Sequence, residues 1–210
     1  MSTFRQVTKK CFMCGKESTH HMLVSTSAFG SMDLDTRPPA LARHANNNHA
    51  QMCPHCGYAN YTIDTETSVP AAFLQSESYL KIAKQQLPEV AMKFCRHAMI
   101  GKEENDAKKE FWGYMRAAWA CDDEQKDLSA RVCRLCALDT LNNATTPIMN
   151  NEDSAAIMHA DLLRRTQQFD EVIKRFDKYQ SDNDFLQKLI RYEVKLAKAK
   201  DAECHSVDEG

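Results

Sequence analysis

Two pairs of cysteines carry the clearest chemistry in the chain. Cys11 and Cys14 form one CxxC pair, and after 38 intervening residues Cys53 and Cys56 form a second. A spacer of two residues lets one tight turn direct both thiolates at a single tetrahedral ion, so two such turns provide four ligands. Because four thiolates leave no open coordination position for water, the pattern predicts one structural Zn²⁺ and no catalysis at the metal.

The residues beside the two pairs indicate the surrounding structure. Gly15 and Gly57 directly follow the pairs, and glycine permits the positive φ that such turns commonly need. It also lets backbone N–H groups approach the sulfurs. Short β-prone stretches flank the pairs at residues 3–8, 22–26 and 58–63. We therefore predict a zinc ribbon over residues 1–66, with a long inserted loop.

That inserted loop holds a second candidate site. Asp33 and Asp35 alternate with an apolar residue, so in an extended conformation their carboxylates share a face, and Arg37 follows before a Pro-Pro pair. One interpretation is a surface loop whose acidic side chains cap its own turns. The other is a loop in which Asp33, Asp35 and Arg37 meet a ligand or a partner. The composition leaves both open.

From about residue 71 the composition becomes that of helices. Residues 71–200 contain only two glycines and two prolines, which favours long helices. Apolar residues recur there at helical spacing in four stripes: Phe73, Leu80, Ala83 and Leu87; Ala91, Phe94, Cys95, Ala98 and Met99; Phe111, Met115, Ala118 and Trp119; Leu128, Val132, Leu135 and Leu138. The predicted fold class is α+β, a small β-rich zinc ribbon followed by an all-α array of helical hairpins.

The later part of this region resembles a tetratricopeptide unit in its register. The matching residues are Ala156, Ala160 and Leu163 in the first helix, and Phe169–Val172, Phe176 and Tyr179 in the turn and second helix. Val172 is β-branched where a small residue is expected, and earlier segments keep no 34-residue period. We expect a helical domain over 71–200 that holds another polypeptide, followed by a polar tail at 201–210.

The cysteine count and the absence of apolar runs bear on the compartment. The chain has nine cysteines, an odd number, and its first residues lack the apolar core of a signal peptide. No apolar run reaches the roughly 18 residues that span a membrane. We expect a cytoplasmic protein without a membrane partner. The five other cysteines are interpreted as helix-core or tail residues, with a second metal site at the first four as the alternative: Cys95, Cys121, Cys133, Cys136 and Cys204.

A family resemblance rests on three segments. They are Cys11-x-x-Cys14-Gly15, the loop from Ser25-Thr26 through Phe29-Gly30-Ser31 to Asp33-Leu34-Asp35-Thr36-Arg37-Pro38-Pro39, and Cys53-Pro54-x-Cys56-Gly57-Tyr58. Together they resemble an uncharacterised, mainly prokaryotic family of paired-CxxC proteins. The resemblance implies a zinc-binding domain of unknown function and a tetratricopeptide-like helical region, and it makes a structural or binding role of the loop more than accidental. It implies no activity.

Charge and motifs rank the functional hypotheses. Residues 1–62 carry a net charge of +3 and five of the eight histidines, and the remainder carries −5. The leading hypothesis is a non-enzymatic adaptor whose helical array docks a protein, and nucleic-acid binding by the basic ribbon is the alternative. A hydrolase using Asp33, Asp35, His44 or His49, or a redox sensor, ranks lower because no GxSxG, HExxH or P-loop motif occurs.

Overall fold

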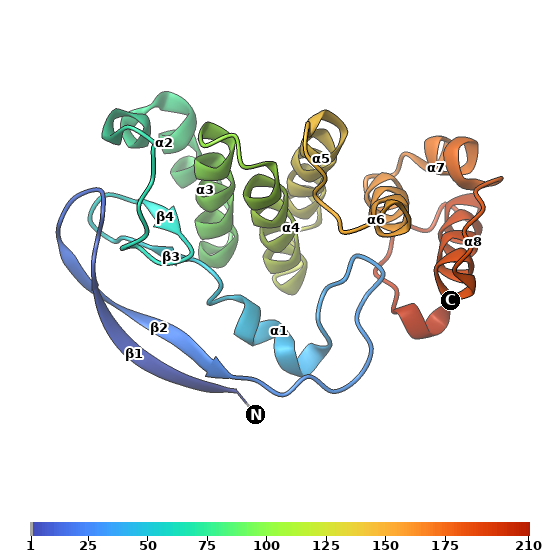
Figure 1. The fold of residues 1–210 in the computed structure, drawn as a ribbon, viewed down its shortest axis with the longest axis horizontal. Coiled ribbons are helices and arrows are strands. Elements are labelled where there is room, and N and C mark those ends of the chain that lie inside the picture. Colours follow the sequence, from blue (N-terminus) through green and yellow to red (C-terminus); the bar gives the residue numbers. More distant parts are fainter. Residues whose placement is uncertain (1) are drawn as a thin grey trace.

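The computed structural model describes residues 2–210, apart from the side chains of Leu41 and Asn46. Two small antiparallel sheets near the N-terminus precede a helical region, as Figure 1 shows. This arrangement confirms the predicted α+β class. No helix within residues 2–210 is long and apolar enough to cross a bilayer.

The first sheet is a hairpin that stands away from the helices. Strands β1 (Thr3–Lys10) and β2 (Glu17–Ser25) pair antiparallel, with Val7 opposite His20. Most side chains on both faces are exposed or half-buried, so packing of the hairpin against the helices contributes little to its stability. Its closed end leads directly into the first CxxC turn.

The second sheet is much shorter than the sequence indicates. Strands β3 (Gln51–Met52) and β4 (Ala59–Asn60) pair over two residues each, whereas a strand was expected over 58–63. The physical reason lies at Asn60, whose side-chain oxygen accepts the backbone N–H of Tyr61. A side chain that takes up the next amide offers the backbone an alternative to the ladder, and the strand ends.

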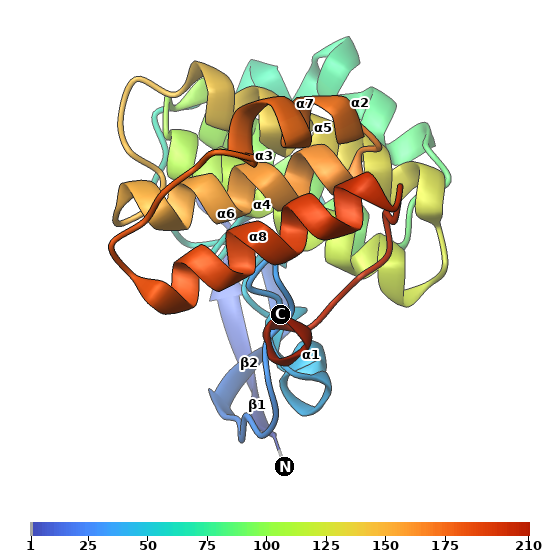
Figure 2. The ribbon, with the colours of Figure 1, turned by 90° about the vertical axis from the view of Figure 1, so that its right-hand side faces the viewer.

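Eight α-helices follow or interrupt these strands within residues 2–210. They are α1 (Ala40–Asn46), α2 (Glu77–Lys84), α3 (Glu89–Glu103), α4 (Ala107–Asp123), α5 (Asp127–Asn143), α6 (Glu152–Arg165), α7 (Phe169–Phe176) and α8 (Asp184–Lys198). Short 3₁₀ turns lie at η1 (Ala71–Gln75) and η2 (Val207–Glu209). From α2 to α8 the helices form a row, and Figure 2 shows the hairpin and α1 below that row.

Side-chain caps explain where four of the helices begin. Ser76, Asp106, Asn151 and Asn183 precede α2, α4, α6 and α8, and each side chain accepts a backbone N–H from the first turn. Because the first amides of a helix have no partner within it, such a cap is worth about 1 kcal/mol. The short polar connections thus divide the helical region into antiparallel neighbours.

Helices α3 and α4 approach each other closely through a small-residue contact. A Cβ placed on Gly113 of α4 would lie 2.7 Å from the Cβ of Ala98 on α3. This part of the core is unusually rich in small side chains, namely Ala50, Ala91, Ala98, Ala117, Ala118, Ala120, Ala130, Cys95, Cys121 and Cys133. Small residues let the helix backbones pack at short distance, so this region is sensitive to added volume.

The predicted apolar stripes agree with burial in α3 and disagree in α5. Ala91, Phe94, Cys95 and Ala98 are buried as expected. In α5, however, Leu128, Val132 and Leu135 are exposed to 81%, 57% and 41%, and that part of the prediction is wrong. The buried face of α5 instead carries Ala130, Cys133, Arg134 and Ala137, whose small or charged side chains give no bulky apolar pattern.

The inserted loop docks beneath the helices and against the C-terminal tail. Leu34 is buried in the core formed by helices α4 to α8. Its backbone N–H donates to the carbonyl of His205 at 2.9 Å, and the N–H of Val207 donates to the carbonyl of Met32 at 3.0 Å. Asp33 and Ser206 form an isolated antiparallel bridge. The residues predicted as a polar tail therefore hold the loop in place.

Candidate functional site

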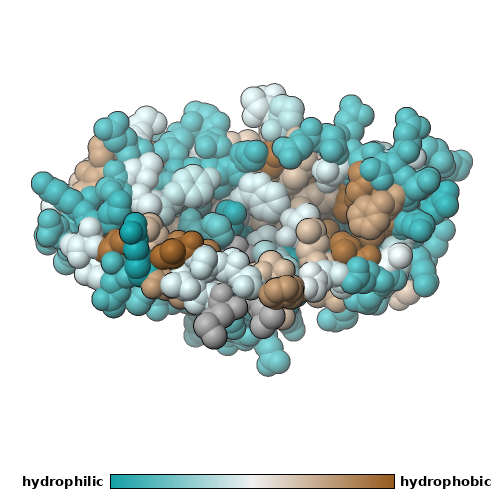
Figure 3. Space-filling model, turned by 60° about the horizontal axis from the view of Figure 1, so that its bottom comes forward, coloured by the Kyte–Doolittle hydropathy of each residue, from teal (hydrophilic) through white to brown (hydrophobic). Residues whose placement is uncertain are grey.

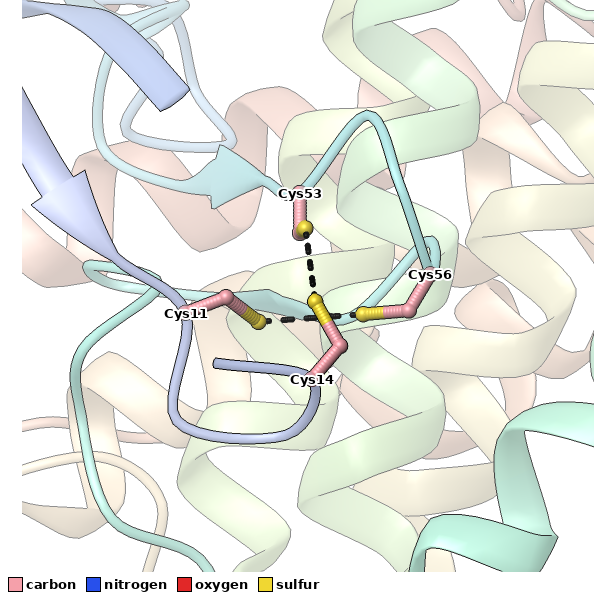
Figure 4. Close-up of side chains that lie close together, drawn as sticks. All are labelled: Cys11, Cys14, Cys53 and Cys56. Carbon is pink, nitrogen blue, oxygen red and sulfur yellow. Dashed lines mark hydrogen bonds between the residues drawn. The ribbon is translucent and has the colours of Figure 1, made fainter. Parts of the chain in front are cut away.

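The two CxxC pairs come together at one point, as Figure 4 shows. The sulfur atoms of Cys11 and Cys56 lie 3.7 Å apart, as do those of Cys14 and Cys53. All four sulfurs lie within 4.8 Å of one another. Four sulfurs bound tetrahedrally at about 2.3 Å would be separated by about 3.8 Å. The four cysteines are thus positioned to bind one metal ion.

Both pairs sit in turns with the same backbone hydrogen bonds. Cys11 donates its N–H to the carbonyl of Lys16 at 2.9 Å, and Cys53 donates to Tyr58 at 2.8 Å. The glycine after each pair closes the turn onto the first cysteine's carbonyl and has a positive φ, 70° at Gly15 and 76° at Gly57. Since non-glycine residues rarely adopt that φ, the glycines explain why each turn folds locally.

Backbone amides also point at the sulfurs. Burial raises the pKa of the Cys11 thiol, and the amides of Cys14 and Met13 oppose that shift. Although burial acts in the other direction, the amide of Lys16 and the neighbouring sulfurs lower the pKa of Cys14. Amides directed at sulfur stabilise a bound thiolate, and a metal ion is bound only when the thiol protons are released.

Side chains from α2 and α3 clamp the second turn. Tyr79 donates its hydroxyl to the carbonyl of Gly57 at 2.8 Å, and the guanidinium of Arg96 lies over the Tyr79 ring, 5.2 Å from its centre. A Cβ on Gly57 would lie 2.6 Å from Arg96 Nη1, so a larger residue there would require the Arg96 guanidinium to move. Sequence reasoning missed this role of Tyr79, because the predicted apolar stripe contains Leu80, which is exposed, and not the buried Tyr79.

The cysteines of the helical region are arranged differently. Cys95 and Cys133 have their sulfurs 3.9 Å apart in the core between α3 and α5, and Cys121 is buried near them. Within residues 2–210, one group of three or more metal-ligating side chains has all its ligand atoms within 4.8 Å of one another. It consists of Cys11, Cys14, Cys53 and Cys56, and it includes no cysteine of the helical region. The helical cysteines pack among alanines, which is the common role of buried cysteine.

Asp35 of the inserted loop lies inside the molecule. It is 1% exposed, and its Oδ2 accepts the indole N–H of Trp119 at 2.7 Å. The guanidinium of Arg134 lies 3.5 Å from the same oxygen. Asp35 Oδ1 accepts the backbone N–H of Arg37 at 3.1 Å. Both carboxylate oxygens are therefore occupied by groups of this chain.

The other two candidate residues of the loop are paired as well. Arg37 is buried and donates to Asp123 at the C-terminal end of α4. Arg43 donates to both oxygens of Asp33, at 2.9 and 2.7 Å. Burial raises the pKa of Asp33, while Cys204 and Arg43 oppose that shift. The structure thus brings Asp33, Asp35 and Arg37 together as anchors of the loop on the helices.

Arg134 is the centre of this network, and sequence reasoning missed it. It donates to both oxygens of Asp122, at 3.0 and 2.5 Å, and is 2% exposed. Burial opposes ionisation of Asp122, yet Arg134 holds its pKa below the usual range. The available signal was an arginine on the face of α5 that also carries Cys133 and Ala137, where a charge needs a buried partner.

A second buried charge cluster lies between α6 and α8. Arg164 donates to Glu193 at 2.5 Å and to Asp161 at 2.9 Å, and all three side chains are almost completely buried. Burial and the charge of Asp161 raise the pKa of Glu193 to about 8, although Arg164 opposes the shift. Two carboxylates therefore share one guanidinium, and their closeness together with burial favours the protonated form of Glu193.

Comparison with protein-family models, with curated proteins and with solved structures gives no match for this chain. The resemblance to paired-CxxC proteins stays a prediction. Functional interpretation therefore depends on the residues and geometry described above.

Proposed function

We propose that the protein is a non-enzymatic adaptor in which one structural Zn²⁺ fixes the N-terminal module beside a protein-binding helical array. The metal assignment is supported by four cysteine sulfurs that all lie within 4.8 Å of one another, with two of the separations at 3.7 Å, since thiolates in this number and geometry favour zinc. With four sulfur ligands the ion supplies folding energy and no open position for a substrate.

Metal analysis of the purified chain tests the first part. We expect one zinc per chain, and loss of that zinc in Cys14→Ser. Cys136→Ser is the matched control, because Cys136 belongs to a CxxC spelling on α5 and lies outside the four-cysteine group. Equal zinc content in both variants, or iron in place of zinc, would contradict the assignment.

The observation that carries the adaptor function is the exposed stripe on α5. Leu128, Val132 and Leu135 occupy positions i, i+4 and i+7, so they lie on one face of the helix. All three are exposed, and an apolar ridge of this spacing matches the groove of another helix. An apolar ridge that is exposed to water is typical of a surface that binds another protein. The occupant we infer is a helical segment of a partner protein.

The tetratricopeptide-like description of the later helices belongs to the same proposal. Ala156, Ala160 and Val172 are buried between α6, α7 and α8, as the close-packing positions of such a hairpin would be. Helix α7 spans only 8 residues against 14 in α6, so the second helix of the unit is short. Arrays of packed helical hairpins commonly hold polypeptides.

Site-specific crosslinking tests the adaptor function in the intact chain. A photoreactive amino acid replaces Leu128, and the same residue at the exposed Lys178 is the control position. We expect a discrete protein adduct from Leu128 that disappears when Val132 and Leu135 are changed to glutamate. Absence of any adduct, or equal adducts from both positions, would overturn the proposal.

Nucleic-acid binding by the hairpin is the second candidate. The β1–β2 ribbon projects from the body, and Arg5, Lys10 and Lys16 are exposed along it. A two-stranded ribbon fits the major groove of DNA, where basic side chains contact phosphates.

Anisotropy measurements with a labelled duplex test this candidate. If these three basic residues contact phosphates, log affinity should fall with log salt at a slope of about −3. Arg5→Glu with Lys10→Glu should remove binding, whereas a salt-independent signal would exclude it. Lys9 is not included because Asp64 neutralises it at 2.6 Å.

A further inference from the structure

A cavity lies where the inserted loop meets the C-terminal helices. Its volume is about 510 Å³, within the range of about 300–1,000 Å³ that is typical of ligand sites. One wall is formed by loop residues 30–34, and the other walls come from α4, α6, α8 and the connection between α5 and α6. Apolar side chains make up most of the lining: Leu34, Trp112, Ile148, Met149, Ile157, Met158, Leu186 and Leu189.

The mouth of this cavity keeps large apolar side chains in water. Met32 on the loop is 48% exposed and Phe185 at the start of α8 is 56% exposed, and both line the cavity. Phe29, close to the lining residue Gly30, is 73% exposed. Figure 3 shows apolar side chains gathered on this face at the end where α8 lies. A small molecule inside the cavity would leave these rim residues in water, whereas a polypeptide would cover them.

Charge around the cavity is asymmetric. The charged lining residues are Asp33 and Lys108, and Asp33 is neutralised by its two hydrogen bonds from Arg43. Lys108, at the start of α4, is exposed and forms no ion pair within 4.0 Å in the part of the chain that the structure describes. On the tail side, Ser31 donates to Asp208. The uncompensated positive charge therefore lies on the α4 side alone, where it complements an acidic group.

We propose that this cavity binds a polypeptide segment of a partner protein, which inserts a bulky apolar side chain between the loop and α8 and places an acidic side chain against Lys108. This inference rests on the proposed adaptor function and identifies the chemistry of a partner segment. Methionines at 32, 149 and 158 add adaptable walls, which suit peptide side chains of different shape. The loop that the sequence singled out thus forms part of a binding site through its main chain and apolar residues, while its charged side chains hold it in position.

A displayed library of random dodecapeptides, panned on the full zinc-loaded chain, provides the probe. We expect enrichment of peptides that combine Phe, Leu, Met or Trp with a nearby Asp or Glu. A synthetic peptide of the enriched sequence should bind Lys108→Glu about tenfold more weakly than the unchanged protein. Changing the peptide's acidic residue to lysine should restore binding to Lys108→Glu. Lys81→Glu, an exposed lysine on α2, is the charge-matched control and should bind as the unchanged protein does.

Phe185→Ser tests the apolar rim without disturbing the core, because the side chain is 56% exposed. It should weaken the same peptide by about tenfold while the thermal midpoint stays close to that of the unchanged protein. No enrichment, or a peptide insensitive to both Lys108→Glu and Phe185→Ser, would overturn the inference. Stoichiometric binding of decanoate without peptide enrichment would also overturn it, assigning the cavity to a small aliphatic carboxylate. The crosslinking experiment at Leu128 tests the adaptor function separately, because an adduct on α5 does not depend on this cavity.

Discussion

At the scale of single residues, buried ion pairs fix the loop on the helices. Asp35 and Arg37 are nearly inaccessible to water, and their partners Trp119, Arg134 and Asp123 come from α4 and α5. A buried charge without its partner costs several kcal/mol, so each pair penalises any other placement of the loop. These pairs therefore determine where the loop docks more than they add to the net stability of the fold.

Trp119→Phe isolates one of these bonds. The change removes the N–H that donates to Asp35 and leaves that oxygen with only the 3.5 Å approach of Arg134. We expect a loss of about 2 kcal/mol in the free energy of unfolding, measured by urea denaturation. Trp112→Phe is the control, because the Trp112 indole makes no hydrogen bond within residues 2–210. Equal effects of the two substitutions would argue against a special role of the bond.

The raised pKa of Glu193 makes stability depend on pH. Its pKa is raised to about 8 in the folded state, and an unfolded glutamate has a pKa of about 4.3. Between these values the folded state binds more protons than the unfolded state, so this group lowers stability as the pH rises from about 5 to about 8.

Glu193→Gln removes that dependence. The variant should match the unchanged protein near pH 5 and exceed it near pH 8, because glutamine stays neutral throughout. Urea midpoints measured across this range with saturating zinc provide the test, and Glu171→Gln on the surface of α7 provides the control. Parallel pH profiles for Glu193→Gln and the unchanged protein would show that Glu193 is ionised in the fold.

At the scale of elements, the close contact between α3 and α4 sets the spacing of the helical row. Ala98 leaves no room for a side chain on Gly113, because a Cβ there would lie 2.7 Å from the Cβ of Ala98 and 2.9 Å from its backbone Cα and N. Neighbouring alanines continue this small-residue contact. Insertion of a single methyl group must therefore push the two helices apart.

We expect Gly113→Ala to destabilise the protein, whereas the same substitution usually stabilises a helix. In an ordinary helix this substitution stabilises by about 1 kcal/mol, because alanine has the higher helix propensity. Here the added Cβ meets Ala98, so we expect destabilisation of about 1–3 kcal/mol, seen as a lower thermal midpoint. A raised midpoint would mean that the helices accommodate the methyl group without cost.

Local sequence patterns predicted individual turns and helices better than they predicted which elements pack against one another. The CxxC spacing and the glycines that follow it correctly predicted that four cysteines lie together, because each turn is closed by its own backbone hydrogen bonds. The helical region was predictable from glycine and proline scarcity. The α5 stripe was misassigned because periodicity identifies an apolar face but does not say whether another element covers it. Arg134 escaped notice because its acidic partners, Asp35 and Asp122, come from other elements.

At the scale of the whole molecule, the metal-binding module and the helices share surfaces. The second cysteine turn packs on Tyr79 and Arg96, and the inserted loop contributes Leu34 to the core of α4 to α8. The β1–β2 hairpin, in contrast, has no fully buried residue in either strand. Removal of the metal should therefore affect the regions unequally.

Chelation of the proposed zinc ion should loosen the N-terminal module and leave the helices largely folded. We expect increased hydrogen exchange in residues 3–25 and 51–66, because these residues fold around the cysteine group. Exchange in α6 and α8 should change little, and most of the circular dichroism at 222 nm should remain. Cys53→Ser should reproduce the pattern. Collapse of the helical signal in either experiment would show that the module and the helices unfold as one cooperative unit.

The hydrogen bond between Leu34 and His205 has a consequence for synthesis on the ribosome. The four cysteines are all available once residue 56 has emerged, so the proposed zinc ion could bind before the helices are made. Leu34 lies between the two pairs, yet the core that it joins spans residues 111–197 and its hydrogen-bond partner is His205. Since domains form from the N-terminus during synthesis, we expect the loop to stay undocked until the segment around His205 has been made. Docking of the loop would then follow assembly of the helices that it contacts.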